Sequence, residues 1–158
     1  MITDMDLMHL RNCVALAEQA LEGGHSPFGS VLANNSGEVL YADHNRDGEG
    51  DRTRHPEFAI ARWATAHLSS DERVSSVVYT SGEHCPMCSA AHAWAGLGRI
   101  VYVSSAEQLS QWLAEFRVPG PPTAALPITQ VAPGLQVEGP VPELVPAVKE
   151  LQRRYYFG

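Results

Sequence analysis

Hydrophobic and polar residues recur with two different periods along this chain. Between residues 5 and 22, apolar residues recur at spacings of three and four, which predicts a helix with one buried face. Gly23-Gly24 then ends the helix. Residues 28–34 and 38–44 are short apolar runs joined by Asn34–Gly37, and this turn chemistry predicts an antiparallel hairpin.

Beyond the hairpin, helical and strand patterns alternate. The pattern predicts helices from Pro56 to about residue 69, from Pro86 until Gly98 and from Ser105 to Phe116, and strands over 75–80 and 99–103. Proline is well suited to the first position of a helix, and serine to the position just before one. This order predicts a three-layer α/β/α sandwich around a mixed five-stranded sheet.

The last quarter of the chain differs in character. Residues 118–140 are rich in proline and show no helical period. Within residues 118–140 we expect Pro127–Val131 and Leu135–Val137 to form short edge strands. After them, we expect Pro142 to about Tyr155 to form a last helix.

Composition and charge narrow the class of protein. A hydrophobic fraction of 44% and a charged fraction of 18% are typical of a globular domain. We expect one domain over residues 1–158, with residues 118–158 as a variable C-terminal extension. The net charge of −7, without a stripe of Lys or Arg, argues against a nucleic-acid partner.

Three further observations concern the compartment. The three cysteines are too few for a disulfide framework. The N-terminal segment is acidic where a signal peptide would be positive, and no apolar run reaches the roughly 20 residues of a membrane span. The expectation is a cytoplasmic protein without a membrane partner.

Two short motifs carry the candidate chemistry, His55-Pro56-Glu57 and Cys85-Pro86-Met87-Cys88, and each opens a predicted helix. One imidazole and two thiolates suit Zn²⁺, with bonds of about 2.0 to 2.3 Å. Three protein ligands leave a fourth position for water, as in catalytic zinc sites. Glu57 lies two residues from His55, so it faces another side of the helix and is free to move protons.

Two other interpretations stay open. If the adjacent His84 supplied a fourth ligand, the zinc would be closed and structural, and the chain would be a non-catalytic binding module. If Cys85 and Cys88 formed a redox pair, the chain would be a thiol oxidoreductase that needs no metal.

Taken together, the two motifs resemble the signature of the zinc-dependent nucleobase and nucleoside deaminases, the cytidine deaminase-like superfamily. The similarity extends from Pro27-Phe28-Gly29 through Asn45 to about Val103, roughly half of the chain. It is greatest for the guanine, cytosine and tRNA-adenosine deaminase branch, which shares Cys-Pro-Met-Cys. The chain departs from the signature at His84, where relatives have proline.

The resemblance implies roles for individual residues. His55, Cys85 and Cys88 would hold the zinc, and Glu57 would be the general acid and base. The residues expected to shape the substrate pocket are Asn45, Phe28, His84, Glu83 and Tyr156. Asn45 would contact the ring, His84 would lie at the pocket rim, and Glu83 would mainly bond amides of its loop. Tyr156 belongs to the tail 155–158, which either caps the site or packs on the body of the protein.

The resemblance also implies the reaction and the partners. We expect hydrolytic deamination of a free amino-substituted nucleobase, such as cytosine, guanine or a related purine, pyrimidine or triazine, with release of ammonia. A nucleoside or nucleotide stays open as the alternative, since Arg46, Arg52 and Arg54 lie near the motifs. The acidic balance disfavours tRNA. The expected assembly is a homodimer, with Trp94 as a candidate interface residue.

Overall fold

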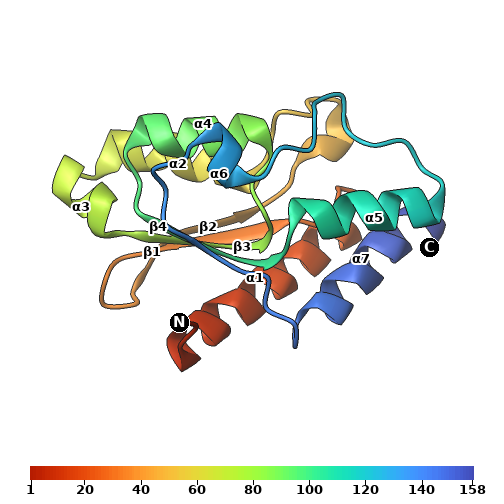
Figure 1. Ribbon diagram of the computed structural model, residues 1–158, viewed down its shortest axis with the longest axis horizontal. Helices are drawn as coiled ribbons and strands as arrows, with labels where there is room; N and C mark the ends of the chain where they lie inside the picture. Colours follow the sequence, from red (N-terminus) through yellow and green to blue (C-terminus); the bar gives the residue numbers. More distant parts are fainter.

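The computed structural model describes residues 1–158 and shows one sheet between two layers of helices (Figure 1). The strands, in the order β2-β1-β3-β4-β5 across the sheet, are β2 (Val39–His44), β1 (Gly29–Ala33), β3 (Val77–Gly82), β4 (Arg99–Ser104) and β5 (Val137–Glu138). β1 pairs antiparallel with β2 and β3, whereas β3 with β4 and β4 with β5 are parallel. The prediction of an α/β/α sandwich with a mixed five-stranded sheet is confirmed.

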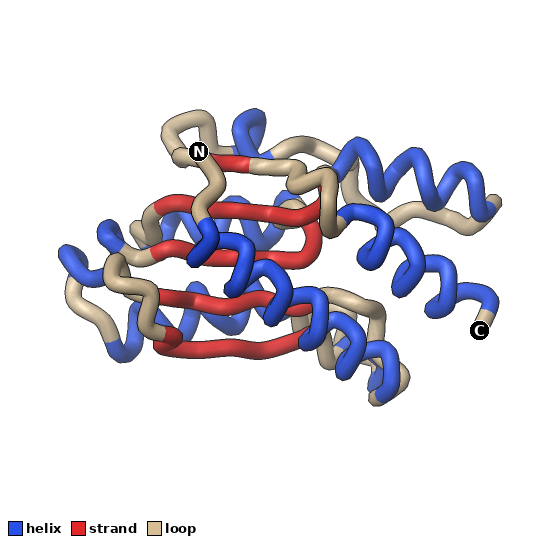
Figure 2. The backbone as a smooth tube through the Cα atoms, turned by 90° about the horizontal axis from the view of Figure 1, so that it is seen from below, coloured by secondary structure: helices blue, strands red, loops and turns tan.

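Helices cover both faces of the sheet. On one face lie α1 (Asp4–Glu22), α5 (Ala106–Phe116) and α7 (Val145–Phe157); on the other lie α2 (Pro56–His67), α3 (Ser70–Ser75), α4 (Pro86–Ala95) and α6 (Ile128–Val131) (Figure 1). Figure 2 shows α1 running across the strands. A 3-10 turn, η1 (Asp47–Glu49), lies in the loop between β2 and α2. None of the helices has the length and apolar character that crossing a membrane requires.

The two faces of the sheet bury separate hydrophobic clusters, because neighbouring residues of a strand point in opposite directions. Val31 of β1 packs in the cluster under α1 with Leu10, whereas the next residue, Leu32, packs under α2 with Ile60. All five residues of β1 are buried. This is the burial expected of a strand that has helices on both sides.

Several predicted boundaries are wrong, each for a local reason. Ser75 ends α3 instead of opening a strand, because Ser69 caps a short helix and accepts a hydrogen bond from the Glu72 amide. Helix α4 ends at Ala95, before Gly96, which takes the left-handed conformation with φ of 68°. Gly98, predicted to end it, lies where a Cβ would be only 2.4 Å from the backbone oxygen of Val74.

The C-terminal part differs more. Residues 128–131 form helix α6 and not an edge strand, and the fifth strand covers only Val137–Glu138. The last helix begins at Val145, three residues later than predicted, and continues to Phe157, so the aromatic tail is its final turn. Proline-rich sequence lacks the regular period from which such short elements are predicted.

The sheet brings several loops together at one end. β3 and β4 are parallel and end at Gly82 and Ser104 at the same edge, where β1 begins and β2 ends at His44. The loop after β2 leads to α2, and the loop after β3 leads to α4. In open α/β sheets the carboxyl ends of parallel strands are the usual place for a ligand.

Candidate functional site

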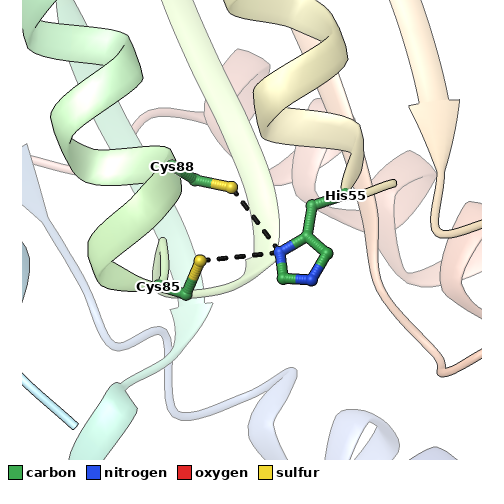
Figure 3. A group of neighbouring side chains, drawn as sticks. All are labelled: His55, Cys85 and Cys88. Atoms are coloured by element: carbon green, nitrogen blue, oxygen red, sulfur yellow. Dashed lines mark hydrogen bonds between the residues drawn. The ribbon is translucent and has the colours of Figure 1, made fainter. Parts of the chain in front are cut away.

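His55 and Cys85 occupy equivalent positions at the starts of α2 and α4. Each is an extended residue that precedes a proline in the first turn of the helix, as the sequence predicted. Cys88 lies one turn further into α4. Because α2 and α4 pack against each other, the three side chains converge from the two helix N-termini (Figure 3).

The donor atoms have the spacing that a zinc ion needs. His55 Nδ1 lies 3.5 Å from Cys85 Sγ and 3.6 Å from Cys88 Sγ. Tetrahedral bonds of about 2.3 Å to sulfur and 2.0 Å to nitrogen would place nitrogen and sulfur about 3.5 Å apart. No further histidine, cysteine or carboxylate joins this group. The donor set therefore fits Zn²⁺ with three protein ligands.

The charges at this group are also suited to a cation. Hydrogen bonds from Cys88 and His55 lower the pKa of the Cys85 thiol to about 4, although burial opposes them. The contact with Cys85, together with burial, raises the pKa of Cys88. A divalent ion would favour thiolates at both positions.

Glu57 is held by two hydroxyl groups from the sheet. Its side chain is buried, and Oε1 accepts hydrogen bonds from Ser30 Oγ at 2.8 Å and Thr80 Oγ1 at 2.9 Å. Ser30 and Thr80 are partners on β1 and β3, and both are fully buried. Burial raises the pKa of Glu57, and no lysine or arginine pairs with it. One carboxyl oxygen is thus fixed, while Oε2 has no hydrogen bond to nitrogen or oxygen.

Asn45 and Phe28 lie side by side at the same edge of the sheet. The backbone N–H of Asn45 donates to the backbone carbonyl of Phe28 at 3.0 Å. The Phe28 ring lies against Gly82, at the end of β3. The Asn45 side chain is 2% exposed, and its Oδ1 is buried without a hydrogen-bond partner. An unpaired buried acceptor is costly, so this atom is a candidate for contact with a ligand. Substrate contact by Asn45 and Phe28 stays a prediction.

His84 does not lie at a pocket rim, and that expectation is wrong. The side chain is 1% exposed and packs edge-on against His92, with ring centroids 5.4 Å apart. Burial lowers the pKa of His84, which favours the neutral ring. His84 is also not among the side chains whose donor atoms converge with His55, so it does not close the metal site.

Glu83 and Tyr156 also have defined surroundings. Glu83 Oε2 accepts a hydrogen bond from the Ala106 backbone amide at 3.2 Å, so its partner is the first residue of α5 and not an amide of its own loop as expected. Tyr156 is partly exposed, and its ring lies 6.4 Å from that of Phe116 on α5. The tail therefore contacts α5, and capping of the site stays a prediction. A role for either side chain in substrate binding stays a prediction.

Sequence reasoning missed the hydroxyl residues around the site. Ser30 and Thr80 were assigned only to strands, and Ser26 was given no role. Hydroxyl side chains within otherwise apolar, fully buried strands were the available signal, because such groups need hydrogen-bond partners.

Comparisons with known proteins agree with this geometry. Residues 3–104 match the family described as the cytidine and deoxycytidylate deaminase zinc-binding region. The chain is 32% identical over 108 residues to a probable cytosine deaminase of Schizosaccharomyces pombe, covering 68% of this chain and 65% of that protein. It is 30% identical over 96 residues to guanine deaminase of Bacillus subtilis, covering 60% and 62%. The matched region spans less than two thirds of the length of these curated relatives.

Solved structures extend the likeness beyond the matched region. A structure of guanine deaminase from Nitrosomonas europaea superposes with a TM-score of 0.71 at 22% identity, covering 98% of this chain and 85% of that one. A structure from work on tRNA:A34 deaminases has a TM-score of 0.56 at 30% identity, covering 63% and 76%. The first of these shows that the fold is shared along nearly the whole chain, including residues 118–158.

Proposed function

Since the chain belongs to the family of the cytidine and deoxycytidylate deaminase zinc-binding region, we propose that it catalyses zinc-dependent hydrolytic deamination of a free amino-substituted nucleobase. One observation carries the proposal: His55, Cys85 and Cys88 have the spacing of a three-ligand zinc site, and the buried carboxyl of Glu57, which pairs with no lysine or arginine, lies near enough for the charges of His55 and Cys85 to act on its pKa. A redox pair or a structural metal site would not need that carboxyl.

Three residues would hold the metal, and their chemistry suits the task. A zinc ion bound by His55, Cys85 and Cys88 supplies a Lewis acid that makes water acidic near neutral pH. The two thiolates offset the charge of the ion, and the N-termini of α2 and α4 favour negative charge beside them.

Glu57 would carry the proton. Ser30 and Thr80 fix Oε1, so Oε2 is the oxygen that takes a proton from water and passes it to the ring nitrogen and the departing amino group. Burial raises the pKa of Glu57, so this carboxyl holds a proton more readily than an exposed one. Water adds to the ring carbon that bears the amino group, the carbon–nitrogen bond breaks, and ammonia leaves.

The choice of a free base rests on charge and on the relatives. Relatives named as cytosine and guanine deaminases support it, as does the net charge of −7. Arg46, near the site, is paired with Asp43 at 2.9 Å, which reduces its capacity to bind a phosphate. The second candidate is adenosine in tRNA, because a tRNA-specific adenosine deaminase of Bacillus subtilis is 29% identical over 98 residues, covering 61% of this chain and 60% of that protein.

A homodimer is part of the proposal. Trp94 of α4 is 92% exposed, on the helix that carries Cys85 and Cys88. Large exposed aromatic residues are enriched at protein interfaces. Sedimentation of the zinc-loaded protein should show two copies, whereas a monomer at all concentrations would contradict this part.

The proposed reaction is tested by measuring ammonia release from the zinc-loaded protein. The substrates are cytosine, guanine, amino-triazines, the matching nucleosides and an adenosine-containing tRNA anticodon stem. We expect turnover of at least one free base that exceeds turnover of its nucleoside. Release from the tRNA alone would favour the second candidate, and release from none of them would contradict the proposal.

A further inference from the structure

We propose that Ser26 and Asp47 are positioning residues that fix the side-chain amide of Asn45, so that its carbonyl oxygen is presented to the substrate and selects a base with a ring N–H. This inference rests on the proposed function, because it concerns how the same site reads its base. It adds two residues that belong to neither the metal group nor the proton-transfer group.

A chain of hydrogen bonds joins the three residues. Asn45 Nδ2 lies 2.6 Å from Ser26 Oγ, and Ser26 Oγ lies 2.5 Å from Asp47 Oδ2. The Ser26 amide N–H also donates to Asp47 Oδ1 at 3.0 Å. These hydrogen bonds connect the loop after β2 to the segment that precedes β1. The side-chain amide of Asn45, the most buried of the three residues, is the last member of this series of hydrogen bonds.

The direction of each hydrogen bond follows from the number of protons. Although burial raises the pKa of Asp47, the hydrogen bonds from Ser26 lower it below the ordinary value of 3.8, so this carboxylate is ionised and can only accept. The single hydroxyl proton of Ser26 must therefore point to Asp47. The Ser26 oxygen can then only accept from Asn45, and the group facing it must be the NH₂ of the amide.

The other side of the amide is consequently an acceptor. Asn45 is only 2% exposed, and its Oδ1 is buried without a hydrogen-bond partner in the protein. If the amide were rotated by 180°, its oxygen would face the Ser26 oxygen, whose only proton points to Asp47. Its NH₂ group would then face the side where the protein offers no partner, so neither side of the amide would have a hydrogen bond. The chain of hydrogen bonds therefore holds an unpaired carbonyl oxygen in place, at the edge of the sheet where Phe28 and Gly82 lie.

An acceptor in this position calls for an N–H on the base. Cytosine has only one N–H besides its reacting amino group, and it is on the ring nitrogen that carries the sugar in a nucleoside. A free base can donate from this nitrogen and a nucleoside cannot. A buried acceptor left unpaired is penalised, so the loss of that donor weakens binding by about fivefold to tenfold.

The inference is tested with cytosine and 1-methylcytosine, because methylation of cytosine removes its only ring N–H. Their affinities for the zinc-loaded Glu57→Gln protein are measured by calorimetry, so that turnover does not interfere. In this background Ser26→Ala and Asp47→Asn should each reduce the preference for the unmethylated base by about fivefold to tenfold. A steric effect of the methyl group is common to all variants and cancels from the comparison.

The same loop offers a matched control. Thr53 Oγ1 donates to Asp51 Oδ1 at 2.6 Å, a similar hydroxyl–carboxylate pair that does not reach Asn45. Asp51→Asn should keep the original preference. Because Asp47 lies in a partly exposed loop, Asp47→Asn gives a folded test protein even if Ser26→Ala does not.

The outcomes separate this inference from the proposed function. An unchanged preference in folded Asp47→Asn contradicts the inference, whereas bases that bind with the expected preference but are not deaminated by the unsubstituted protein contradict only the proposed function. Failure of cytosine to bind contradicts the inference, and the proposed function is contradicted as well only if no free base releases ammonia.

Discussion

Two neighbouring residues of β3 point to opposite faces of the sheet, and each donates a hydrogen bond to a buried carboxyl group. Tyr79 donates to Asp6 of α1 at 2.7 Å, and Thr80 donates to Glu57 of α2 at 2.9 Å. Both carboxyl groups are well buried, 2% exposed for Asp6 and 6% for Glu57. They differ in what else surrounds them.

Asp6 is neutralised by a cation, and Glu57 is not. Arg99 binds both oxygens of Asp6, at 3.0 and 2.9 Å, and also pairs with Glu138. Against the effect of burial, these contacts hold the pKa of Asp6 well below its usual range, whereas burial raises that of Glu57. A paired carboxylate ties α1 to β4 and cannot readily exchange protons. An unpaired one, held only by hydroxyls, is suited to proton transfer.

The largest expected effect is on the unpaired carboxyl. Glu57→Gln should lower kcat by about 10³-fold to 10⁴-fold, because the amide cannot take up the proton. Zinc content and thermal stability should stay near those of the original protein. The measurement is ammonia release at equal zinc occupancy. Full activity in a zinc-loaded Glu57→Gln protein would remove this residue from the reaction.

Removing the charge of Asp6, which pairs with Arg99, should lower the stability of the fold and leave the reaction rate unchanged. Asp6→Asn leaves the charge of Arg99 without its main partner, so the free energy of unfolding should fall by about 3 kcal/mol. The folded fraction should keep its kcat, because Asp6 lies across the sheet from the site. Urea unfolding and activity assays on the same sample test both statements. A loss of kcat without a loss of stability would contradict the division between the two faces.

The adjacent strand residues provide a matched pair with smaller effects. Thr80→Val removes one of the two hydrogen bonds to Glu57 and should lower kcat about tenfold, with KM nearly unchanged. Tyr79→Phe removes the hydrogen bond to Asp6 and should cost about 1 kcal/mol of stability, with kcat unchanged. Thr80→Ser should restore most of the activity. Equal effects of Thr80→Val and Tyr79→Phe on kcat would mean that the faces are not separate.

The pH dependence of stability gives the finest distinction. The pKa of Asp6 is depressed in the folded protein. The stabilisation of the folded state by ionised Asp6 is therefore fully present above the ordinary pKa of 3.8 and is lost as the pH falls below that value. The unfolding free energy should therefore decline on acidification below about pH 4, and less steeply in Asp6→Asn. Denaturant titrations between pH 3 and 6 would show this; parallel curves for the two proteins would contradict it.

Much of the fold and the metal group could be predicted from sequence. His55, Cys85 and Cys88 stand out because each motif places a metal-binding side chain beside a proline that opens a helix. The hairpin and the helix Ala106–Phe116 were predictable from turn and cap residues, which act within a few positions. Local interactions of this kind depend only on residues that are close in sequence.

The roles of Tyr79 and Thr80 could not be predicted in the same way. β3 is buried on both faces, so it lacks the alternation of polar and apolar residues that tells one face from the other. The burial of His84 likewise depends on its packing against His92, and the amide of Asn45 depends on Ser26, 19 residues away. These contacts follow from how distant segments pack, which no local pattern encodes.

The proposed reaction requires a metal ion held by His55, Cys85 and Cys88 alone. X-ray absorption on protein loaded with one zinc per chain counts the neighbouring atoms by element. We expect two sulfur ligands, one histidine nitrogen and one oxygen from solvent. A fourth protein ligand, or a chain that does not retain zinc, would contradict this expectation.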